Sequence, residues 1–316
     1  MKTLKNIALQ GLLTLGILFS SCINQDKKEE QAAESAPLST IVVDTITLSG
    51  AYALNSLMKN WVTAFNDVYP NVFIQISNED AVEAMDKASR NELDLVMISS
   101  EEQIDPQMWK MPLARTGVVL MYNVQNPYAA QIQQIGLTKE KLKAIFTAEE
   151  PPAWGDYFGE AGETEMSVFR REDNAGAHRT LVKFLGIEEG TMQGQMKEGE
   201  QEMCMGIRDN ILAIGYCNLS TVYDLGKLEL RSHVGIMPCD LNANGRIDAK
   251  EEIPTDYEEI IRTFCLGKYP TDLCRVLFVV APVAPVDPVV NAFLDFCLGE
   301  GQNAIDSLAY ARLRPS

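Results

Sequence analysis

The chain of 316 residues is poor in histidine and in positive charge. Its only two histidines, His178 and His233, lie far apart, and it has no CxxC pair. Histidine-based catalysis and zinc ligation are therefore not expected. Lys and Arg number 27 against 44 Asp and Glu, so the formal charge is −17. Nucleic acid and anionic membrane surfaces would repel such a chain, and neither is expected as a partner.

Enzyme signatures are also missing. The sequence shows no nucleophile elbow, no paired histidines and no two-metal carboxylate cluster. A phosphohydrolase or another enzyme is therefore the least favoured class of function.

The N-terminus has an apolar run, Ile7 to Leu18, that is too short to span a bilayer. Two lysines precede it and small residues follow it, which is the layout of a secretory signal. The segment ends in Phe19-Ser20-Ser21-Cys22, which resembles the lipobox of bacterial lipoproteins. Residues 1–22 are thus predicted to be a lipoprotein signal peptide, with Cys22 as the lipid anchor. A plain signal peptide with an incidental cysteine is the alternative.

Residues 23–38 are rich in Gln, Lys, Glu, Ala and Ser, and they cannot bury a core. This composition predicts a flexible tether. The protein is therefore expected to be extracytoplasmic and to meet the membrane only through its lipid, at the outer membrane, at the cell surface or facing the periplasm.

The folded part begins with alternating strand and helix patterns. They predict strands over Thr40–Leu48, Val72–Ile76 and Leu93–Ile98, with helices over Leu54–Tyr69 and Asp80–Arg90. This order indicates parallel βαβ units in an open α/β sheet. Ligands bind such sheets where the strands end. The loops to examine are therefore Ser49–Tyr52, Ser77–Asp80 and Ser99–Glu101.

Later segments predict a chain that leaves one lobe, builds a second and returns through a strand at Val276–Ala281 and a helix at Pro288–Leu298. The expected first lobe is 39–118 plus 279–316, and the second is 119–278. Such a two-lobed α/β fold has a ligand cleft that can hinge shut.

Residues 240–251 match a calcium loop at every ligand position. Oxygen side chains stand at positions 1, 3, 5, 9 and 12, a glycine, Gly245, at position 6, and the backbone carbonyl of Arg246 would serve at position 7. The predicted metal residues are Asp240, Asn242, Asn244, Arg246, Asp248 and Glu251. A turn that binds nothing is the alternative. Two neutral Asn ligands favour weak binding, suited to extracytoplasmic fluid, so a structural calcium is expected.

A series of motifs follows in order along the chain, at residues 49–54, 137–142, 145–147, 154–155, 169–177 and 213–216. In this order they resemble the periplasmic phosphate-binding proteins of ABC transporters, and the resemblance covers about Thr40 to Arg314. A member of this family is expected to have the type II periplasmic-binding-protein fold, to bind phosphate or a related small anion, and to deliver it to an ABC permease. A monomer is expected.

The resemblance implies ligand residues from both lobes. Ser49, Gly50, Ala51 and Tyr52 would bring backbone amides to the anion, with Ser99 and Ser100 nearby. From the second lobe, Arg171 would supply a planar charged fork that Asp173 fixes, and Gly176 and Ala177 another helix start. An ordinary surface ion pair is the alternative for Arg171 and Asp173.

The sequence departs from the family pattern in one loop. Glu79 and Asp80 stand where the family is glycine- and serine-rich, and two carboxylates there would repel phosphate. Ser77-x-x-Asp80 fits a capping box, so this helix start would satisfy its own amides. Either a carboxylate accepts the proton of hydrogen phosphate, or the site takes another ligand, or the acidic loop lies outside the pocket. A surface binding or interaction lipoprotein with altered specificity is therefore the second hypothesis.

Overall fold

The computed structural model describes residues 44–77, 79–159, 164–172, 175–254, 256–265 and 269–313. The predicted signal peptide, its Cys22, the tether and Asp173 lie outside these residues. Among the described helices, none is both long and apolar enough to cross a membrane.

The first lobe opens with the βαβ pattern that the sequence predicts. Strand β1 (Asp44–Gly50) pairs in parallel with β2 (Val72–Ile76) and with β3 (Leu95–Ile98). Helix α1 (Asn55–Val68), entered through a short 3-10 turn, η2 (Tyr52–Leu54), connects the first two strands, and α2 (Ala81–Ser89) the next two. The three strands therefore end at the same edge of the sheet.

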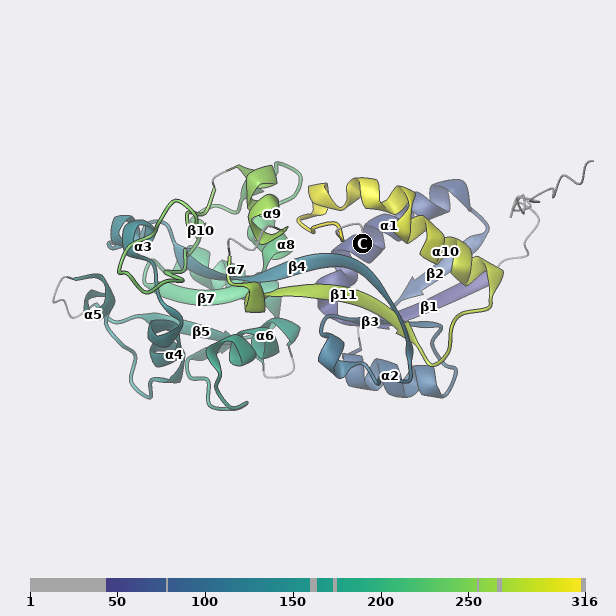
Figure 1. Ribbon diagram of the computed structural model, residues 1–316, viewed down its shortest axis with the longest axis horizontal. Helices are drawn as coiled ribbons and strands as arrows, with labels where there is room; N and C mark the ends of the chain where they lie inside the picture. Colours follow the sequence, from purple (N-terminus) through teal and green to yellow (C-terminus); the bar gives the residue numbers. More distant parts are fainter. Residues whose placement is uncertain are drawn as a thin grey trace, which may run out of the picture. The chain divides into compact units, whose positions relative to one another are not determined.

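Two long antiparallel strands join the lobes. β4 (Trp109–Asn123) pairs with β11 (Cys274–Ala281) over its first half and with β7 (Ala213–Asn218) over Val118–Tyr122. β11 also pairs with β3. One sheet therefore runs in the order β2-β1-β3-β11-β4-β7-β5-β6, in which β5 is Ser167–Arg171 and β6 is Gln195–Lys197, and β10 (Val234–Ile236) lies beside β4. Figure 1 shows β4 and β11 running side by side between the two sets of helices.

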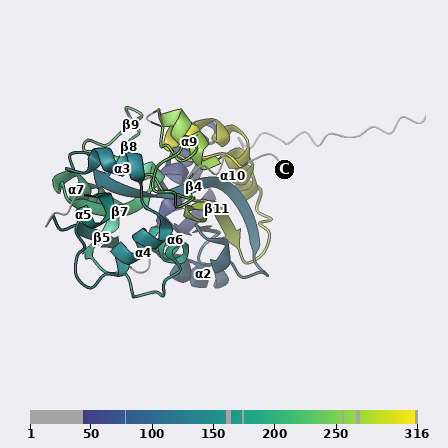
Figure 2. The same cartoon turned by 60° about the vertical axis from the view of Figure 1, so that its left-hand side comes forward.

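The second lobe contains the chain between β4 and β11. Helix α9 (Tyr257–Cys265) lies over β4 (Figure 2). The chain also has short 3-10 turns. These are η3 (Glu101–Gln103) after β3, η4 (Thr271–Leu273) before β11, and η5 (Glu300–Ala304) and η6 (Asp306–Leu308) near the C-terminal end. The elements of the lobe are α3 (Ala129–Ile135), α4 (Lys139–Thr147), α5 (Gly155–Phe158), β5 (Ser167–Arg171), α6 (Gly176–Leu185), β6 (Gln195–Lys197), α7 (Gly199–Asp209), β7 (Ala213–Asn218), α8 (Leu219–Val222), β8 (Tyr223–Asp224), β9 (Glu229–Leu230), β10 (Val234–Ile236) and α9 (Tyr257–Cys265).

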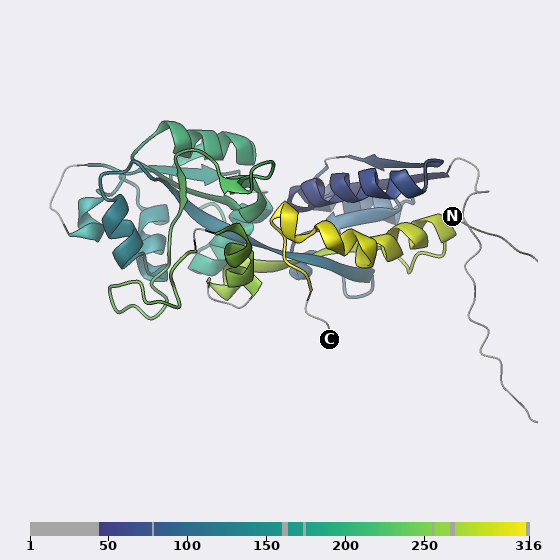
Figure 3. The same ribbon diagram turned by 90° about the horizontal axis from the view of Figure 1, so that it is seen from above.

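Local sequence explains the helices that cover the first lobe. α1 buries Leu57, Met58, Trp61 and Phe65, which fall on one helical face. The last helix, α10 (Pro288–Leu298), begins with an N-cap aspartate whose carboxylate accepts two backbone N–H bonds and a proline in the first turn. The two helices lie side by side on one face of the sheet (Figure 3). The predicted two-lobed α/β fold is confirmed.

Candidate functional site

The loops after β1, β2 and β3 open onto a cavity of about 210 Å3. Its other wall comes from the second lobe, where β5 ends and α6 begins. The cavity thus lies where parallel strands end, as expected for a ligand site in an open α/β sheet. Predicted ligand residues that line it are Gly50, Ala51, Tyr52, Glu79, Asp80, Ser99, Arg171, Gly176 and Ala177.

Two other predicted residues lie just outside this cavity. Ser49 is buried, and its Oγ accepts the backbone N–H of Glu79 at 3.1 Å, so it supports the loop after β2. Ser100 lines a neighbouring hollow of about 450 Å3 that shares Ser99 and Gly176 with the cavity. The position of Asp173, which falls outside the described residues, stays a prediction.

Helix starts without a capping side chain face the cavity from both lobes. The N-cap of α6 is Ala175 and that of η2 is Ala51, and neither side chain can accept a hydrogen bond. Gly50 has φ +122°, and a Cβ there would lie 2.3 Å from the carbonyl oxygen of Met97. Only glycine fits this close approach. The two uncapped helix starts therefore line one cavity, and free backbone N–H groups at a helix start suit an anion.

Arg171 stands at the end of β5 and is only 8% exposed. Its backbone N–H donates to the hydroxyl of Tyr216 at 3.0 Å, which ties the end of β5 to β7. Its Nη1 lies 3.7 Å from Oε1 of Glu200, a separation that gives charge attraction without a good hydrogen bond. Its Nε has no hydrogen-bond partner in the described part of the chain. The guanidinium is thus buried and, within the described part of the chain, has one nitrogen without a hydrogen-bond partner.

Among the described residues, Glu200 is the carboxylate beside Arg171. It comes from α7, which the sequence did not predict, and its carboxylate also accepts bonds from Asn218 and Thr221. Other lining residues missed from the sequence are Gln103, Glu172, Arg179, Asn218 and Arg275. Arg275 was detectable as a charged residue at the head of an otherwise apolar strand.

The acidic loop lies inside the cavity wall, but both carboxylates already have partners. Oε1 of Glu79 lies 2.6 Å from Nζ of Lys87, and Ser77 donates to its Oε2. Lys87, with help from Ser49, lowers the pKa of Glu79, so this carboxyl group is ionised and paired at neutral pH. Asp80 accepts the N–H groups of Val82 and Glu83 as the N-cap of α2.

The predicted capping box is therefore wrong in one detail. Asp80 itself is the N-cap, whereas the Ser77 hydroxyl bonds to Glu79 and to the Leu48 carbonyl. The prediction that α2 satisfies its own first amides is confirmed. The helix starts at the cavity that lack a capping side chain are those of η2 and α6.

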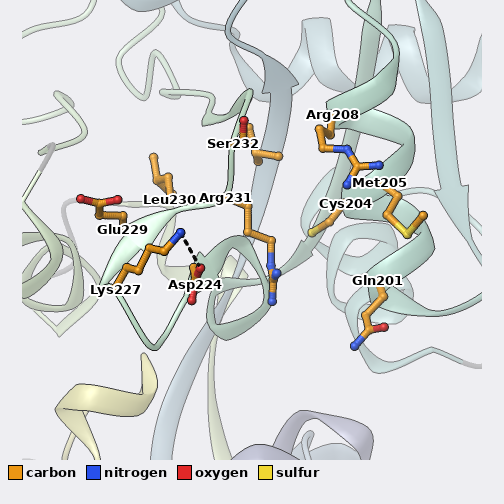
Figure 4. A pocket seen from close by; sticks show the side chains of 11 residues that line it. Gln201, Cys204, Met205, Arg208, Asp224, Lys227, Glu229, Leu230, Arg231 and Ser232 are labelled. Atoms are coloured by element: carbon orange, nitrogen blue, oxygen red, sulfur yellow. Dashed lines mark ion pairs between the residues drawn. The ribbon is translucent and has the colours of Figure 1, made fainter.

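A larger cavity, of about 520 Å3, lies in the second lobe between α7 and the β8–β9 hairpin (Figure 4). Two of its basic side chains already form ion pairs: Nζ of Lys227 lies 3.6 Å from Oδ2 of Asp224, and Arg208 pairs with Asp209. Arg231 donates through Nε to the Thr221 carbonyl. Because the described cations that line it are half-exposed or already bonded, size alone does not make this cavity the candidate site.

The loop at 240–251 folds around its first and last carboxylates, both buried. Asp240 accepts the N–H groups of Asn244 and Gly245, and Glu251 those of Leu241 and Asp248. Gly245 has φ +80°, as a sharp turn requires. The predicted oxygen ligands are thus gathered within one loop.

Three contacts to Asp248 in this loop oppose a bound cation. Asn242 and Asn244 both donate side-chain N–H bonds to Oδ2 of Asp248, at 2.9 Å each, and Arg246 pairs with its Oδ1 at 3.0 Å. These bonds lower the pKa of Asp248, first through Asn242. In the described residues, no three His, Cys, Asp or Glu side chains form a group able to hold a metal. Calcium binding therefore requires the two amides to turn their oxygens inward.

The comparisons place this chain in a family. The model of the PBP superfamily domain matches residues 35–300, so the chain belongs to the PBP superfamily, a family of substrate-binding proteins rather than enzymes. The phosphate-binding protein PstS of Pseudomonas aeruginosa is 23% identical over 289 residues, covering 84% of this chain and 81% of that protein. PstS of Bacillus subtilis is 23% identical over 75% of this chain and 78% of its own length. The resemblance to phosphate-binding proteins is confirmed.

Solved structures agree on the fold. A putative phosphate ABC transporter substrate-binding protein from Clostridium perfringens, with bound phosphate, superposes with a TM-score of 0.66 at 19% identity, covering 85% of this chain and all of that one. An ABC-type phosphate transport receptor from Vibrio cholerae gives 0.63 at 17% identity, with the same coverage.

Proposed function

We propose that this protein captures phosphate or a related small anion outside the cytoplasm and delivers it to an ABC permease. One observation carries the proposal: the uncapped start of α6 and the guanidinium of Arg171, whose Nε has no hydrogen-bond partner among the described residues, line the same cavity. Backbone amides at a helix start and a planar guanidinium are both suited to a tetrahedral oxyanion. The relatives named as phosphate-binding proteins support phosphate as the anion to test first.

Isothermal titration calorimetry with inorganic phosphate tests this proposal. Wild-type protein should bind saturably, and Arg171→Ala should bind roughly tenfold to a hundredfold more weakly, because a charged hydrogen bond is lost. Arg90→Ala, which removes an exposed arginine outside the cavity lining, should bind like the wild type. Circular dichroism should show that Arg171→Ala is folded, because Glu200 keeps its bonds to Asn218 and Thr221. No saturable binding, or binding indifferent to Arg171→Ala, would exclude phosphate as the ligand.

A second candidate keeps the fold but changes the ligand: a surface binding or interaction lipoprotein outside phosphate uptake. The presence of Glu79 and Asp80 in the cavity wall favours it. The pairing of Glu79 with Lys87 counts against it, because that carboxylate is already neutralised. Titration of phosphate, sulfate and a polyamine in parallel separates the two candidates. Saturable binding of the polyamine, with no response to either anion, would support the altered ligand.

We also propose that residues 240–251 bind a structural calcium ion. The convergence of backbone amides on Asp240 and Glu251 supports a preformed loop, and the chemistry of its oxygen donors suits calcium. The ion would fasten the segment between β10 and α9, away from the residues that line the anion cavity.

The proposal has two further parts. The protein is attached to a membrane through a lipid on Cys22, and it is a monomer. The lipobox-like Ser20-Ser21-Cys22 supports the anchor. Fractionation of cells that express wild type or Cys22→Ser tests it: the wild type should sediment with membranes and the variant should be soluble. Equal distribution of the two would contradict lipid attachment.

A further inference from the structure

Arg275 reaches both lobes from the strand that joins them. It lies near the start of β11, and its Nη1 is 3.4 Å from Oγ of Ser99, in the first lobe. The same Nη1 lies 3.2 Å from Oγ1 of Thr180 on α6, and Nη2 donates to the side-chain oxygen of Asn218 at the end of β7. All three partners are neutral, so hydrogen bonds orient this guanidinium without neutralising it.

No carboxylate among the described residues contacts the guanidinium of Arg275. It forms no ion pair within 4.0 Å with any described residue, and its Nε lacks a hydrogen-bond partner there. Desolvation lowers its pKa to about 10, and repulsion from Arg179 acts in the same direction, although Glu200 acts against it. The group is still charged at neutral pH. A half-buried charge that no described carboxylate contacts is less favourable than a paired one, and an anion in the cleft would relieve it.

The guanidinium also packs against the start of α6. A Cβ on Gly176 would lie 2.9 Å from Nη1 of Arg275 and 2.8 Å from Oγ of Ser99. The positive end of the helix and a cation therefore share one wall of the cavity. Two neighbouring positive groups repel each other, and an anion between them would offset this repulsion.

We propose that Arg275 is a second anion-binding residue, which together with Arg171 makes the cleft select doubly charged over singly charged oxyanions. The inference rests on the proposed anion-binding function and names the ligand's charge class. Each additional ligand charge interacts with both guanidinium groups, so a dianion gains more than a monoanion. Because Arg275 bonds to both lobes, the same contact would also hold the cleft closed on its ligand.

Phosphate titrations of the purified full chain, on both sides of the second ionisation of phosphate, test this inference. Arg275→Gln should weaken dianion binding roughly tenfold to a hundredfold and lower the ratio of dianion to monoanion affinity. Arg275→Lys keeps the charge but loses the planar fork, so it should keep the ratio and bind more weakly than the wild type. Arg90→Gln, at an exposed arginine, should match the wild type.

The outcomes separate the two proposals. Wild-type protein that binds no phosphate would overturn the proposed function and, with it, this inference. Wild-type binding with an equal fall in dianion and monoanion affinity in Arg275→Gln would assign Arg275 a structural role and overturn the inference alone. If Arg275→Gln does not fold, Arg275→Lys decides: unchanged affinity in that variant contradicts a direct contact between the Arg275 fork and the ligand.

Discussion

Substitution of Gly176 by alanine should separate ligand binding from stability. Gly176 is the first residue of α6, and it has no positive φ that alanine would oppose. Alanine is favoured over glycine in a helix by up to about 1 kcal/mol, less at a terminus. The new Cβ would lie within 3 Å of the Arg275 and Ser99 side chains, so the far end of a flexible arginine must move. We expect these opposing effects to leave the melting temperature within about 4 °C of the wild type.

The loss in affinity should be larger. A methyl group at the wall of a cavity of only about 210 Å3 would displace Arg275 and keep the anion from the first amides of α6. Losing one charge-assisted hydrogen bond costs about 1.5–3 kcal/mol, which corresponds to roughly tenfold to a hundredfold in the dissociation constant. Calorimetric titration with phosphate and a thermal melt of the same sample measure both quantities. Wild-type affinity in Gly176→Ala would refute the placement of the anion at the start of α6.

Two further predictions concern the acidic loop and the calcium loop. Lys87→Met should flatten the rise in unfolding free energy between acid and neutral pH: the lowered pKa of Glu79 stabilises the fold above its unfolded value of about 4.5, an effect lost as pH falls through the folded pKa. Urea unfolding across this range checks it, and a curve parallel to the wild type would contradict the pairing. Calcium at a hundred times its dissociation constant should stabilise the protein by about 2.7 kcal/mol, and Asp240→Ala should abolish this gain while Asp224→Ala keeps it. A melting temperature indifferent to calcium and to a chelator would leave the loop an ordinary turn.

Local sequence signals predicted the first lobe well. The bounds of β2 and α10 match the expected segments, because a β-rich run after a proline and an Asp-Pro helix start are encoded in neighbouring residues. The loops after the first three strands meet at one cavity because parallel strands end at the same edge of a sheet. A sequence pattern is sufficient for that inference.

Contacts between distant segments could not be predicted in the same way. Glu200 lies on α7, whose buried Met203, Cys204 and Ile207 follow helical spacing but whose two glycines obscure the pattern. Its position beside Arg171 depends on how α7 packs against β5 and β7, which only the folded chain shows. Arg275 is likewise separated from Ser99 by 176 residues. The residues that balance charge in the cavity are thus those that tertiary packing brings together.

The acidic loop shows a third kind of limit. The sequence correctly flagged Glu79 and Asp80 as unusual for a phosphate site, but repulsion depends on their partners as well as on their charge. Lys87 of α2 forms an ion pair with Glu79 and balances its charge. The carboxylate of Asp80 accepts two backbone N–H bonds at the start of α2. The loop is therefore compatible with a nearby anion to a degree that its composition does not suggest.

Calorimetric titration of the wild-type protein and Arg171→Ala with inorganic phosphate at neutral pH tests the proposed function most directly. We predict one saturable site in the wild type and at least about tenfold weaker binding in the variant, with both proteins folded. Absence of binding in the wild type, or equal binding in the two proteins, would contradict an anion site built from Arg171 and the start of α6.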